Sequence, residues 1–397
     1  MKCNWRIKKL SEIAHINPKE SIGKGIMAKK IPMDKLQPFC RDITEFILEE
    51  YKGGAKFRND DTIMARITPC LENGKISKVS ILDDDEVGFG STEYIVFRSI
   101  EDVSDADFLY YLVCSPLVRN PAIKSMVGSS GRQRVQTDVV ADLDIGLPNI
   151  EEQRKIGSIL RNLDDKIALN NVINNNLAEQ AYAIFQSWFI DCSPFGGMAP
   201  SNWVETSLSE VCSCELGGTP SRAKPEYWNG NIPWINSGEV NLFRITKPSE
   251  TITELGLRKS ATKLLPAKTT VIAITGATLG KISLLEIESC ANQSVVGVIP
   301  NELLPYEFIY PYISSNIKEL VSYKTGGAQQ HINKQNVEGL PILIPTNDIM
   351  NEYVSLVRGY YSSIANNCFE NERLAELRDT LLPKLMSGEL AVSEIDL

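Results

Sequence analysis

The sequence is poor in the residues and patterns that mark metal centres, disulfide frameworks and membrane spans. Among its 397 residues only His15 and His331 are histidines, and the nine cysteines show no paired spacing. We therefore expect no metal site and interpret the cysteines as buried thiols of a protein in the reducing cytoplasm. No apolar run approaches the roughly 20 residues that a membrane span needs, and the first residues show no signal-peptide pattern. We expect no membrane partner.

The sequence also lacks the motifs of an enzyme that acts on DNA. Pro69-Cys70 is the nucleophile dipeptide of cytosine methylation, but no glycine-rich cofactor loop precedes it. The stretch 276–283 resembles a phosphate-binding loop, yet it is one residue short and has Ile282 where a hydroxyl for Mg²⁺ belongs. We interpret it as a hairpin turn that presents Lys281. Asp164-Asp165-Lys166 falls on a predicted helix as a solvated face, so we expect no catalytic residue and no cofactor.

Positive charge is scarce overall but not everywhere. The net charge of -9 argues at first against a nucleic-acid partner, because phosphate contacts need lysine and arginine. Most of this deficit, -7, lies in 151–200 and 348–397. Two other stretches, 108–137 and 256–285, contain basic residues and no acidic ones. Local basic surfaces are therefore compatible with an acidic chain.

The most informative positive feature is an internal repeat. Leu10-Ser11-Glu12-Ile13 returns as Leu208-Ser209-Glu210-Val211, and Gly74-Lys75-Ile76-Ser77 returns as Gly280-Lys281-Ile282-Ser283. Each copy closes with a heptad pattern, and moving every position of the first pattern on by 197 gives the second. A duplicated globular half followed by a long helix implies pseudo-twofold symmetry, which suits a twofold ligand such as duplex DNA.

The repeat and the residue patterns predict an α/β (α+β) fold. Short β-branched runs such as 62–65 and 270–274 predict strands, with helical stretches between them. Two pseudo-twofold-related globular domains, 1–148 and 192–345, would be separated by two long helices in 149–191 and 346–397. Since neither helix can bury its apolar stripe alone, we expect an intramolecular antiparallel coiled coil. The alternative is that each helix packs only on its own domain.

Two details of the predicted coiled coil follow from single residues. Asparagines recur at equivalent interior positions of the two helices and would fix their register; these are Asn170, Asn174, Asn367 and Asn371. Pro383 predicts that the second helix kinks or ends early, because proline lacks the amide hydrogen of a helical turn.

Polar loops at the same place in both copies are the candidate DNA-contacting segments. They span 131–137 and 326–333 and are rich in arginine and glutamine, which read guanine and adenine edges. The alternative is a polar connection that caps the next strand. Trp228 could stack on DNA, although a tryptophan before a turn more often belongs to the core. The candidate contact residues are Arg66, Lys75, Arg132, Gln133, Arg134, Gln136, Thr219, Ser221, Trp228, Thr275, Thr278, Lys281, Gln329, Gln330 and His331.

Several motifs together resemble the specificity (S) subunit of type I restriction-modification systems over essentially the whole chain. They are Gly217-Gly218-Thr219-Pro220-Ser221, the stretch from Tyr227 to Trp234, Thr275-Gly276-Ala277-Thr278-Leu279-Gly280-Lys281, the closing stretch 377–390, and the spacer-like 148–159. The first half departs from this pattern, because Asn17-Pro18-Lys19-Glu20 stands where Gly-Gly-Thr-Pro-Ser is expected. It resembles a different subtype of recognition domain.

The resemblance implies a non-catalytic, cytoplasmic reader of double-stranded DNA. Target-recognition domains 1–148 and 192–345 would each read one half of an asymmetric bipartite site. Helical spacers 149–191 and 346–397 would set the gap and dock two methyltransferase (M) subunits, and restriction (R) subunits would join for cleavage. S-adenosylmethionine, Mg²⁺ and ATP would be bound by those partners. A coiled-coil scaffold with two protein-binding domains is the alternative from another class.

Overall fold

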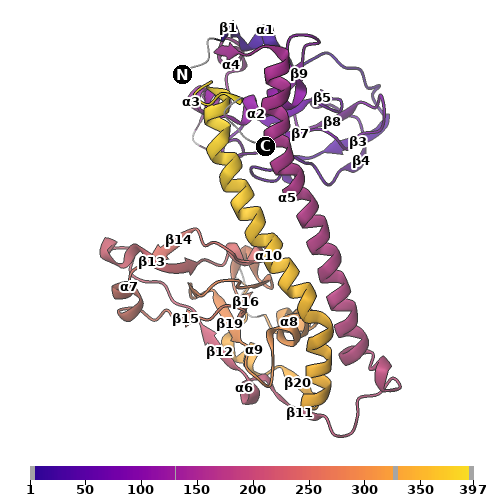
Figure 1. The fold of residues 1–397 in the computed structure, drawn as a ribbon, viewed down its shortest axis with the longest axis vertical. Helices are drawn as coiled ribbons and strands as arrows, with labels where there is room; N and C mark the ends of the chain where they lie inside the picture. Colours follow the sequence, from indigo (N-terminus) through magenta and orange to yellow (C-terminus); the bar gives the residue numbers. More distant parts are fainter. Residues whose placement is uncertain (1–4, 130, 325–329, 393–397) are drawn as a thin grey trace. The chain divides into compact units, whose positions relative to one another are not determined.

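The computed structural model describes residues 5–129, 131–324 and 330–392 and divides into two compact units (Figure 1). Unit 1 comprises Met1–Ala168 and Arg373–Leu397, and unit 2 comprises Leu169–Glu372. Each unit therefore holds one globular body and a length of both long helices, which are α5 (Ile150–Phe185) and α10 (Asn347–Met386). In the described part of the chain, no helix combines the length and the apolar character that crossing a membrane requires.

Unit 1 contains two four-stranded sheets and a short two-stranded one. The first sheet is antiparallel throughout and has the order β2 (Ala14–Ile16), β9 (Tyr94–Ser99), β6 (Thr62–Ala65), β7 (Ile76–Lys78). The second has the order β4 (Ile47–Glu50), β3 (Met27–Ile31), β8 (Gly88–Gly90), β5 (Lys56–Phe57). The short sheet pairs β1 (Arg6–Lys9) with β10 (Asp144–Leu147). The helices of this body are α1 (Leu10–Ile13), α2 (Ala106–Cys114), α3 (Pro116–Lys124) and α4 (Thr137–Ala141).

Unit 2 repeats this plan strand for strand. Its first sheet has the order β12 (Ser213–Leu216), β19 (Val295–Ile299), β16 (Thr270–Ala273), β17 (Ile282–Leu284). The second has the order β14 (Glu250–Ile252), β13 (Trp228–Ile235), β18 (Ser289–Ala291), β15 (Leu264–Leu265). The short sheet pairs β11 (Val204–Ser207) with β20 (Pro341–Ile344). The helices are α6 (Leu208–Val211), α7 (Glu254–Arg258), α8 (Tyr306–Ser322) and α9 (Lys334–Glu338).

The alternation of side chains along the central strands explains the layers of each unit. In β6, Met64 joins the core formed with α2 and the start of α5, while Ile63 joins the core beneath the second sheet. In β16, Ile272 likewise joins the core with α8 and α10, while Val271 packs toward the second sheet. Because successive side chains of a strand point to opposite faces, each first sheet lies between a helical layer and another sheet.

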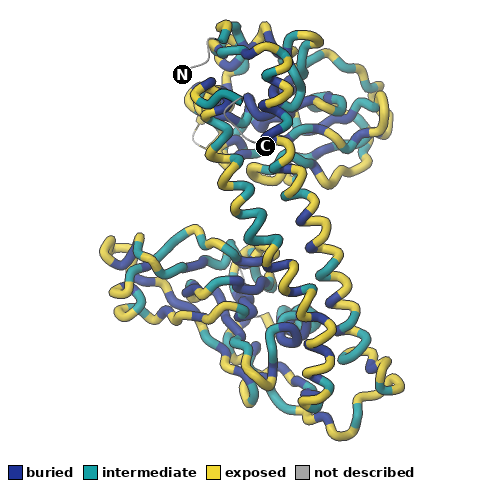
Figure 2. Tube along the Cα trace, viewed as in Figure 1, coloured by how far each residue is buried: buried dark blue, intermediate teal, exposed yellow. Residues whose placement is uncertain are grey.

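The two long helices run antiparallel within each unit. In unit 2, Asn170 of α5 contacts Asn371 of α10 and Asn174 contacts Asn367, so one numbering rises as the other falls. Figure 2 shows buried positions recurring along α5. Asn170 and Asn174 of this helix are each 1% exposed. The predicted α/β fold with two repeated globular bodies and a pair of antiparallel long helices is confirmed.

The expectation that Pro383 shortens the second helix is wrong, because α10 continues to Met386. Leu385 and Met386 are 0% and 1% exposed and belong to the core of unit 1. Burial of these two side chains outweighs the one hydrogen bond that a proline removes from the last turn. Gly388, at a φ of 66°, follows where the helix stops.

Candidate nucleic-acid interface

The polar loops of unit 2 gather at one edge of its first sheet. The strands of that sheet are antiparallel, so the ends of β12 and β16 and the starts of β19 and β17 share this edge. Two hydrogen bonds tie the loops together there, from Gly217 N to Val295 O (3.0 Å) and from Ile332 N to Ile274 O (3.1 Å). We call the segments 217–222, 275–281, 292–294 and 330–332 the loop edge of unit 2.

The same construction produces the loop edge of unit 1, which we define as 17–20, 66–75, 91–93 and 132–136. Here Val135 N donates to Arg66 O (2.8 Å), and Arg66 N donates to Glu93 O (2.8 Å). Isolated bridges place Arg134 opposite Ile67 in unit 1 and His331 opposite Thr275 in unit 2. The two loop edges are therefore structural counterparts that carry different side chains.

Most candidate residues of unit 2 lie on its loop edge. The exposed ones are Thr219, Ser221, Lys281, Gln330 and His331, and Thr275 and Thr278 are half-buried. Gln329 lies outside the described residues. The Thr219 hydroxyl is hydrogen-bonded to Gln293, an exposed amide that the sequence reading missed although it sits in the connection before β19. The predicted hairpin turn is confirmed, since β16 and β17 pair around 274–281 and Lys281 is exposed.

The Gly217-Gly218 pair is required by close packing of the backbone. A Cβ added at Gly217 would lie 2.1 Å from Asn292 O, and one at Gly218 would lie 2.6 Å from Thr262 N. Only glycine permits such an approach. The indole of Trp234 donates to Gly218 O (3.1 Å) and holds this loop against β13. The following residues, Thr219 and Ser221, are presented by a rigidly seated segment.

Trp228 lies in a hydrophobic core cluster of unit 2. It is 9% exposed, its Nε1 donates to Ser221 O (3.2 Å), and its ring meets Trp234 edge to face at 5.1 Å. The guanidinium of Arg222 covers it at 3.6 Å from the ring centroid. The core alternative is therefore the one that the structure supports, because the indole is buried and both its N–H and its ring already have partners.

The candidates of unit 1 are more strongly engaged within the protein. Arg132 is exposed, but Arg134 forms a forked pair with Glu93, with Nη2 at 2.6 Å from Oε1 and Nε at 3.0 Å from Oε2. The hydrogen bonds from Arg134 lower the pKa of Glu93 and hold it as a carboxylate. Lys75 donates to Met33 O (2.8 Å) and is half-buried, unlike its exposed counterpart Lys281.

The two glutamines of this loop serve the backbone. Gln136 donates through Nε2 to Ser125 O (2.9 Å). Gln133 bonds Thr68 through its own main-chain amide, which donates to Thr68 Oγ1 (3.0 Å), and not through its side chain. The side chain of Gln133 is half-buried. In this loop the exposed guanidinium groups are those of Arg132 and Arg134, while the exposed Gln136 also bonds the loop backbone.

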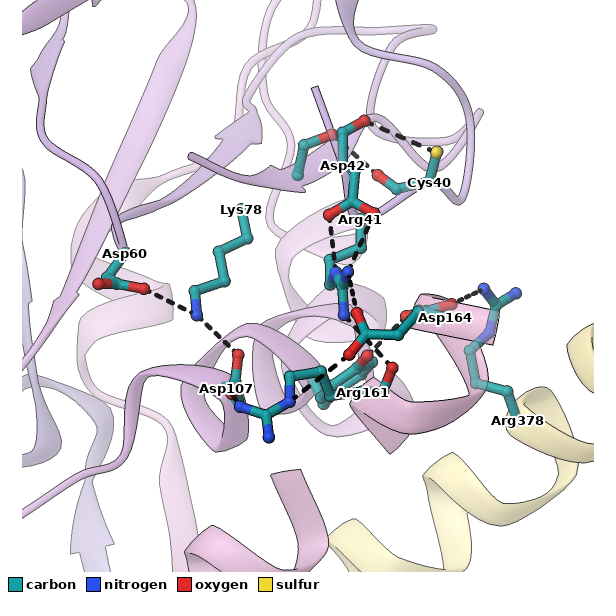
Figure 3. A network of polar contacts seen from close by, with 12 residues as sticks. Cys40, Arg41, Asp42, Asp60, Lys78, Asp107, Arg161, Asp164 and Arg378 are labelled. Atoms are coloured by element: carbon teal, nitrogen blue, oxygen red, sulfur yellow. Dashed lines mark hydrogen bonds and ion pairs between the residues drawn. The ribbon is translucent and has the colours of Figure 1, made fainter. Parts of the chain in front are cut away.

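A polar network attaches the helices to the body of unit 1 (Figure 3). Asp107 accepts from Lys78 (2.6 Å) and from Arg161 of α5 (2.9 Å). Burial alone would lower the pKa of Lys78, but its bonds to Asp107 and Asp60 raise it, so the ammonium stays charged. Arg41 reaches Asp165 of α5 (2.5 Å). These contacts fix how the helical layer meets the first sheet.

The interpretation of Asp164-Asp165-Lys166 as a solvated face is wrong for Asp164. This carboxylate is 6% exposed and accepts from Arg378 of α10 (2.7 Å) and from the hydroxyl of Tyr111 (2.6 Å) (Figure 3). The sequence signal was present, because Arg378 occupies an interior heptad position where a charge needs a partner.

The described cysteines are free thiols, and four of the eight are buried. Burial raises the pKa of Cys114 and of Cys214 to about 12 and that of Cys212 to about 11, so these sulfurs stay protonated at neutral pH. The expectation of buried thiols is wrong for four of the described cysteines, which are only partly buried: Cys40, Cys70, Cys114 and Cys368. Among the described residues no group of three or more acidic, histidine or cysteine side chains could hold a metal ion.

Comparison with known proteins gives one consistent family. The model of the type I restriction modification DNA specificity domain matches residues 2–179 and again 200–369. The HindI specificity subunit of Haemophilus influenzae is 25% identical, with 76% of this chain and 81% of that protein covered. The MjaIX specificity subunit of Methanocaldococcus jannaschii is 27% identical, with 75% and 73% covered.

One solved structure supports the fold independently. The S subunit of a type I restriction-modification system from M. genitalium superposes with a TM-score of 0.58 and 14% identity, and 96% of each chain is covered. At this identity the likeness concerns architecture alone. The duplicated match of the family model coincides with the duplicated sheets described above.

Proposed function

The chain belongs to the family of type I restriction-modification DNA specificity domains, and on that premise we propose that it is the DNA-recognition subunit of a type I restriction-modification complex. Each globular body reads one half of an asymmetric bipartite site in double-stranded DNA. The loop edges make the contacts, with Thr219, Ser221, Thr275, Thr278, Lys281, Gln330 and His331 acting in the second half and Arg66, Lys75, Arg132, Gln133, Arg134 and Gln136 in the first. Gln329, which lies outside the described residues, is a further proposed contact of the second half.

The observation that carries this proposal is that the two units have the same sheet topology but different side chains in their loops. Register places Arg134 and His331 at equivalent bridges, and it places Gly217-Gly218 where the first repeat has Lys19-Glu20. Equivalent sheets present their loops in the same way, whereas different loop side chains bind different base edges. Two unlike half-sites on one duplex follow directly.

The remaining roles are assigned to partners. We propose that the chain itself is non-catalytic and binds no cofactor, and that it acts in the cytoplasm. Two methyltransferase subunits dock on the helical segments 149–191 and 346–397 and bind S-adenosylmethionine, while restriction subunits supply the ATP- and Mg²⁺-dependent steps. The absence of a cofactor loop and of a nuclease triad in the sequence supports this division.

The test is reconstitution. The purified chain should bind duplex DNA with an affinity that falls steeply with salt, and it should neither methylate nor cut it. Adding the cognate methyltransferase subunit should produce adenine methylation at one bipartite motif, read by sequencing of methylated sites. Turnover by the chain alone would contradict a non-catalytic role. Salt-insensitive or absent duplex binding would favour the protein-binding scaffold instead.

A further inference from the structure

Unit 1 has an open groove of about 360 Å³ at its loop edge, between its two sheets. Its walls come from β5, β9 and the segments that follow β2 and β6, and they include Asn17, Gly54, Lys56, Arg66, Thr92 and Tyr94. None of its lining residues is acidic. The groove therefore has two cationic side chains and no built-in counterion.

Both cations lack ion-pair partners within the described residues. Lys56 is half-buried, and its described side-chain interaction is with the ring of Tyr51, at 5.7 Å. Arg66 donates through Nη2 to Val135 O (3.3 Å), while its Nε is buried without an acceptor. The carboxylate of Glu93 on this loop edge, whose pKa the charge of Arg66 also helps to lower, is bonded through both oxygens to Arg134. A buried donor without an acceptor is costly unless a ligand supplies one.

The groove presents donors and hardly any acceptors. Asn17 uses its Oδ1 to accept from Val96 N (3.0 Å), so its amide nitrogen remains to donate. Together with Lys56 and Arg66 this makes three donor groups, two of them charged. Such a set matches the oxygens of a phosphate group, which accept hydrogen bonds and carry negative charge.

Unit 2 has filled the corresponding place. Lys56 pairs with Phe89 as Leu264 pairs with Cys290, so Leu264 is the counterpart of Lys56. Ile274, 5% exposed, follows β16 as Arg66 follows β6. Gly218 packs against Ala261 and Thr262, and Gly217 packs against Ala291 and Asn292. The second repeat therefore has apolar side chains at the positions of both cations, and its two glycines pack closely against neighbouring backbone.

We propose that the groove of unit 1 binds a backbone phosphate of DNA through Lys56 and Arg66, and that unit 2 makes no equivalent contact. This inference rests on the proposed function and adds an asymmetry to it: one loop edge carries a built phosphate site and the other does not. Lys56 is a DNA-contacting residue that the sequence patterns did not reveal. A free phosphate compound has the same chemistry and is separated from DNA by the experiment.

The experiment measures binding of the full chain to a mixed-sequence DNA duplex from about 50 to 200 mM salt. Lys56→Gln and Arg66→Gln should each reduce the slope of log affinity against log salt by about 0.9, and the double variant by about 1.8. Lys8→Gln is the matched control, because Lys8 lies on β1, which pairs with β10 and lines no part of the groove, and its loss changes the net charge equally. Its slope should equal that of the unaltered chain.

The outcomes are separable. If the unaltered chain binds no duplex, the proposed function fails and this inference with it. If it binds and both groove variants keep its slope while their unfolding midpoints are unchanged, only the groove assignment is overturned. A parallel titration with inorganic phosphate tests the other source of the ligand. If phosphate raises the unfolding midpoint of the unaltered chain but not that of Lys56→Gln, and the salt slope of DNA binding is the same for both, the groove binds a free anion and not DNA. Lys56→Gln alone suffices if Arg66→Gln disturbs the fold.

Discussion

Arg134 and His331 occupy the same position in the two repeats, yet their electrostatic surroundings differ. The carboxylate of Glu93 holds Arg134, whereas Ser294 stands at the corresponding place of unit 2, as the matching bonds Arg66 N to Glu93 O and Ile274 N to Ser294 O show. A guanidinium that is shared with a carboxylate has less charge to offer a phosphate or a base. We therefore expect Glu93 to reduce the contribution of Arg134 to DNA binding by the first half.

Replacing Glu93 by Gln should strengthen DNA binding through the first half. The release of Arg134 should increase the salt slope of duplex binding by about 0.9, as expected for one added phosphate contact. Hydrogen bonds from Arg134 lower the pKa of Glu93 from 4.5, so the pair contributes stability above that value and loses it as pH falls through the lowered pKa. Unfolding midpoints measured from pH 7 down to 3 should show this acid loss in the unaltered chain and a smaller one in the variant.

Glu151→Gln is the matched control for this change, because it removes one exposed carboxylate from the start of α5. Its salt slope should rise by less than that of Glu93→Gln. Equal slopes for the two variants would show that only net charge matters and that Arg134 does not meet DNA.

The Asp164–Arg378 pair should behave as a buried ion pair. Asp164→Leu leaves the guanidinium of Arg378 with the exposed Asp379 as its remaining partner and should destabilise unit 1 by about 3 kcal/mol. Adding Arg378→Met should recover most of this loss, because two apolar side chains can replace a buried pair at little cost. Denaturant unfolding of the single and double variants measures the difference. Equal losses in both would mean that Arg378 is stabilised elsewhere.

At the scale of elements, periodicity and turn chemistry predicted what local sequence determines. The strands 62–65 and 270–273, the hairpin turn before Lys281 and the antiparallel helices all follow from residue patterns within a short stretch of chain. The end of α10 did not follow, because the burial of Leu385 and Met386 depends on a core formed by residues far away in the sequence. Tertiary packing decided that boundary.

The candidate site shows the same division. Loop positions could be predicted because the repeat aligns 131–137 with 326–333. Which side chains remain available could not be, since that depends on partners such as Glu93 for Arg134 and Arg222 for Trp228, which lie 41 and 6 positions away. Lys56 was missed for the opposite reason. Nothing in its local sequence indicates a binding residue, and only the register of β5 with β8 brings it to the groove.

The asparagines of the helix pair should set its register at a cost in stability. Asn170 donates to Asn371 (2.9 Å) and to Glu370 (2.7 Å), and Asn367 donates to Asn174 (2.9 Å). Asn170→Leu alone leaves buried polar partners unsatisfied and should cost about 1–3 kcal/mol. Asn170→Leu with Asn371→Leu should restore or raise the unfolding midpoint while allowing alternative registers.

The register is read independently of stability. Spin labels at the exposed positions Val172 and Ser363, both in unit 2, report the distance between α5 and α10. The double leucine variant should broaden that distance distribution, and Val172→Leu, an exposed apolar change, supplies the control with labels moved to Asn176 and Ser363. A stabilised double variant with an unbroadened distribution would show that other contacts fix the register.

At the scale of the whole molecule, each globular body is completed by helix from both repeats. The core of unit 2 contains Ala181 and Phe185 of α5, and the core of unit 1 contains Leu385 and Met386 of α10. Moving a position of the first heptad pattern on by 197 gives its equivalent in the second, so Trp188, which lies in the segment Gln186–Ile190 just after α5, corresponds to Leu385 of α10. The C-terminal end of each long helical segment thus completes the core of a globular body, but with different side chains in the two cases. We therefore expect the loops to be exchangeable between the halves, whereas each core is adapted to the helix end that it packs against.

A chain that joins two copies of 201–397 should therefore recognise a new, symmetric site. Identical readers on a repeated frame meet the same bases on opposite strands, so the motif should be an inverted repeat of the second half-site. Neither Trp188 nor Phe195 is present in this chain, so both bodies would meet Leu385 in place of Trp188 and lose its aromatic contact with Tyr353. The joined chain should therefore unfold at a lower temperature than the natural one. Sequencing of methylated sites, with the cognate methyltransferase added, identifies the motif.

The reciprocal chain, with two copies of 1–200, should give an inverted repeat of the first half-site. If the joined second halves methylated the original asymmetric motif, residues 1–200 would not read DNA, and the division of recognition between two loop edges would be wrong.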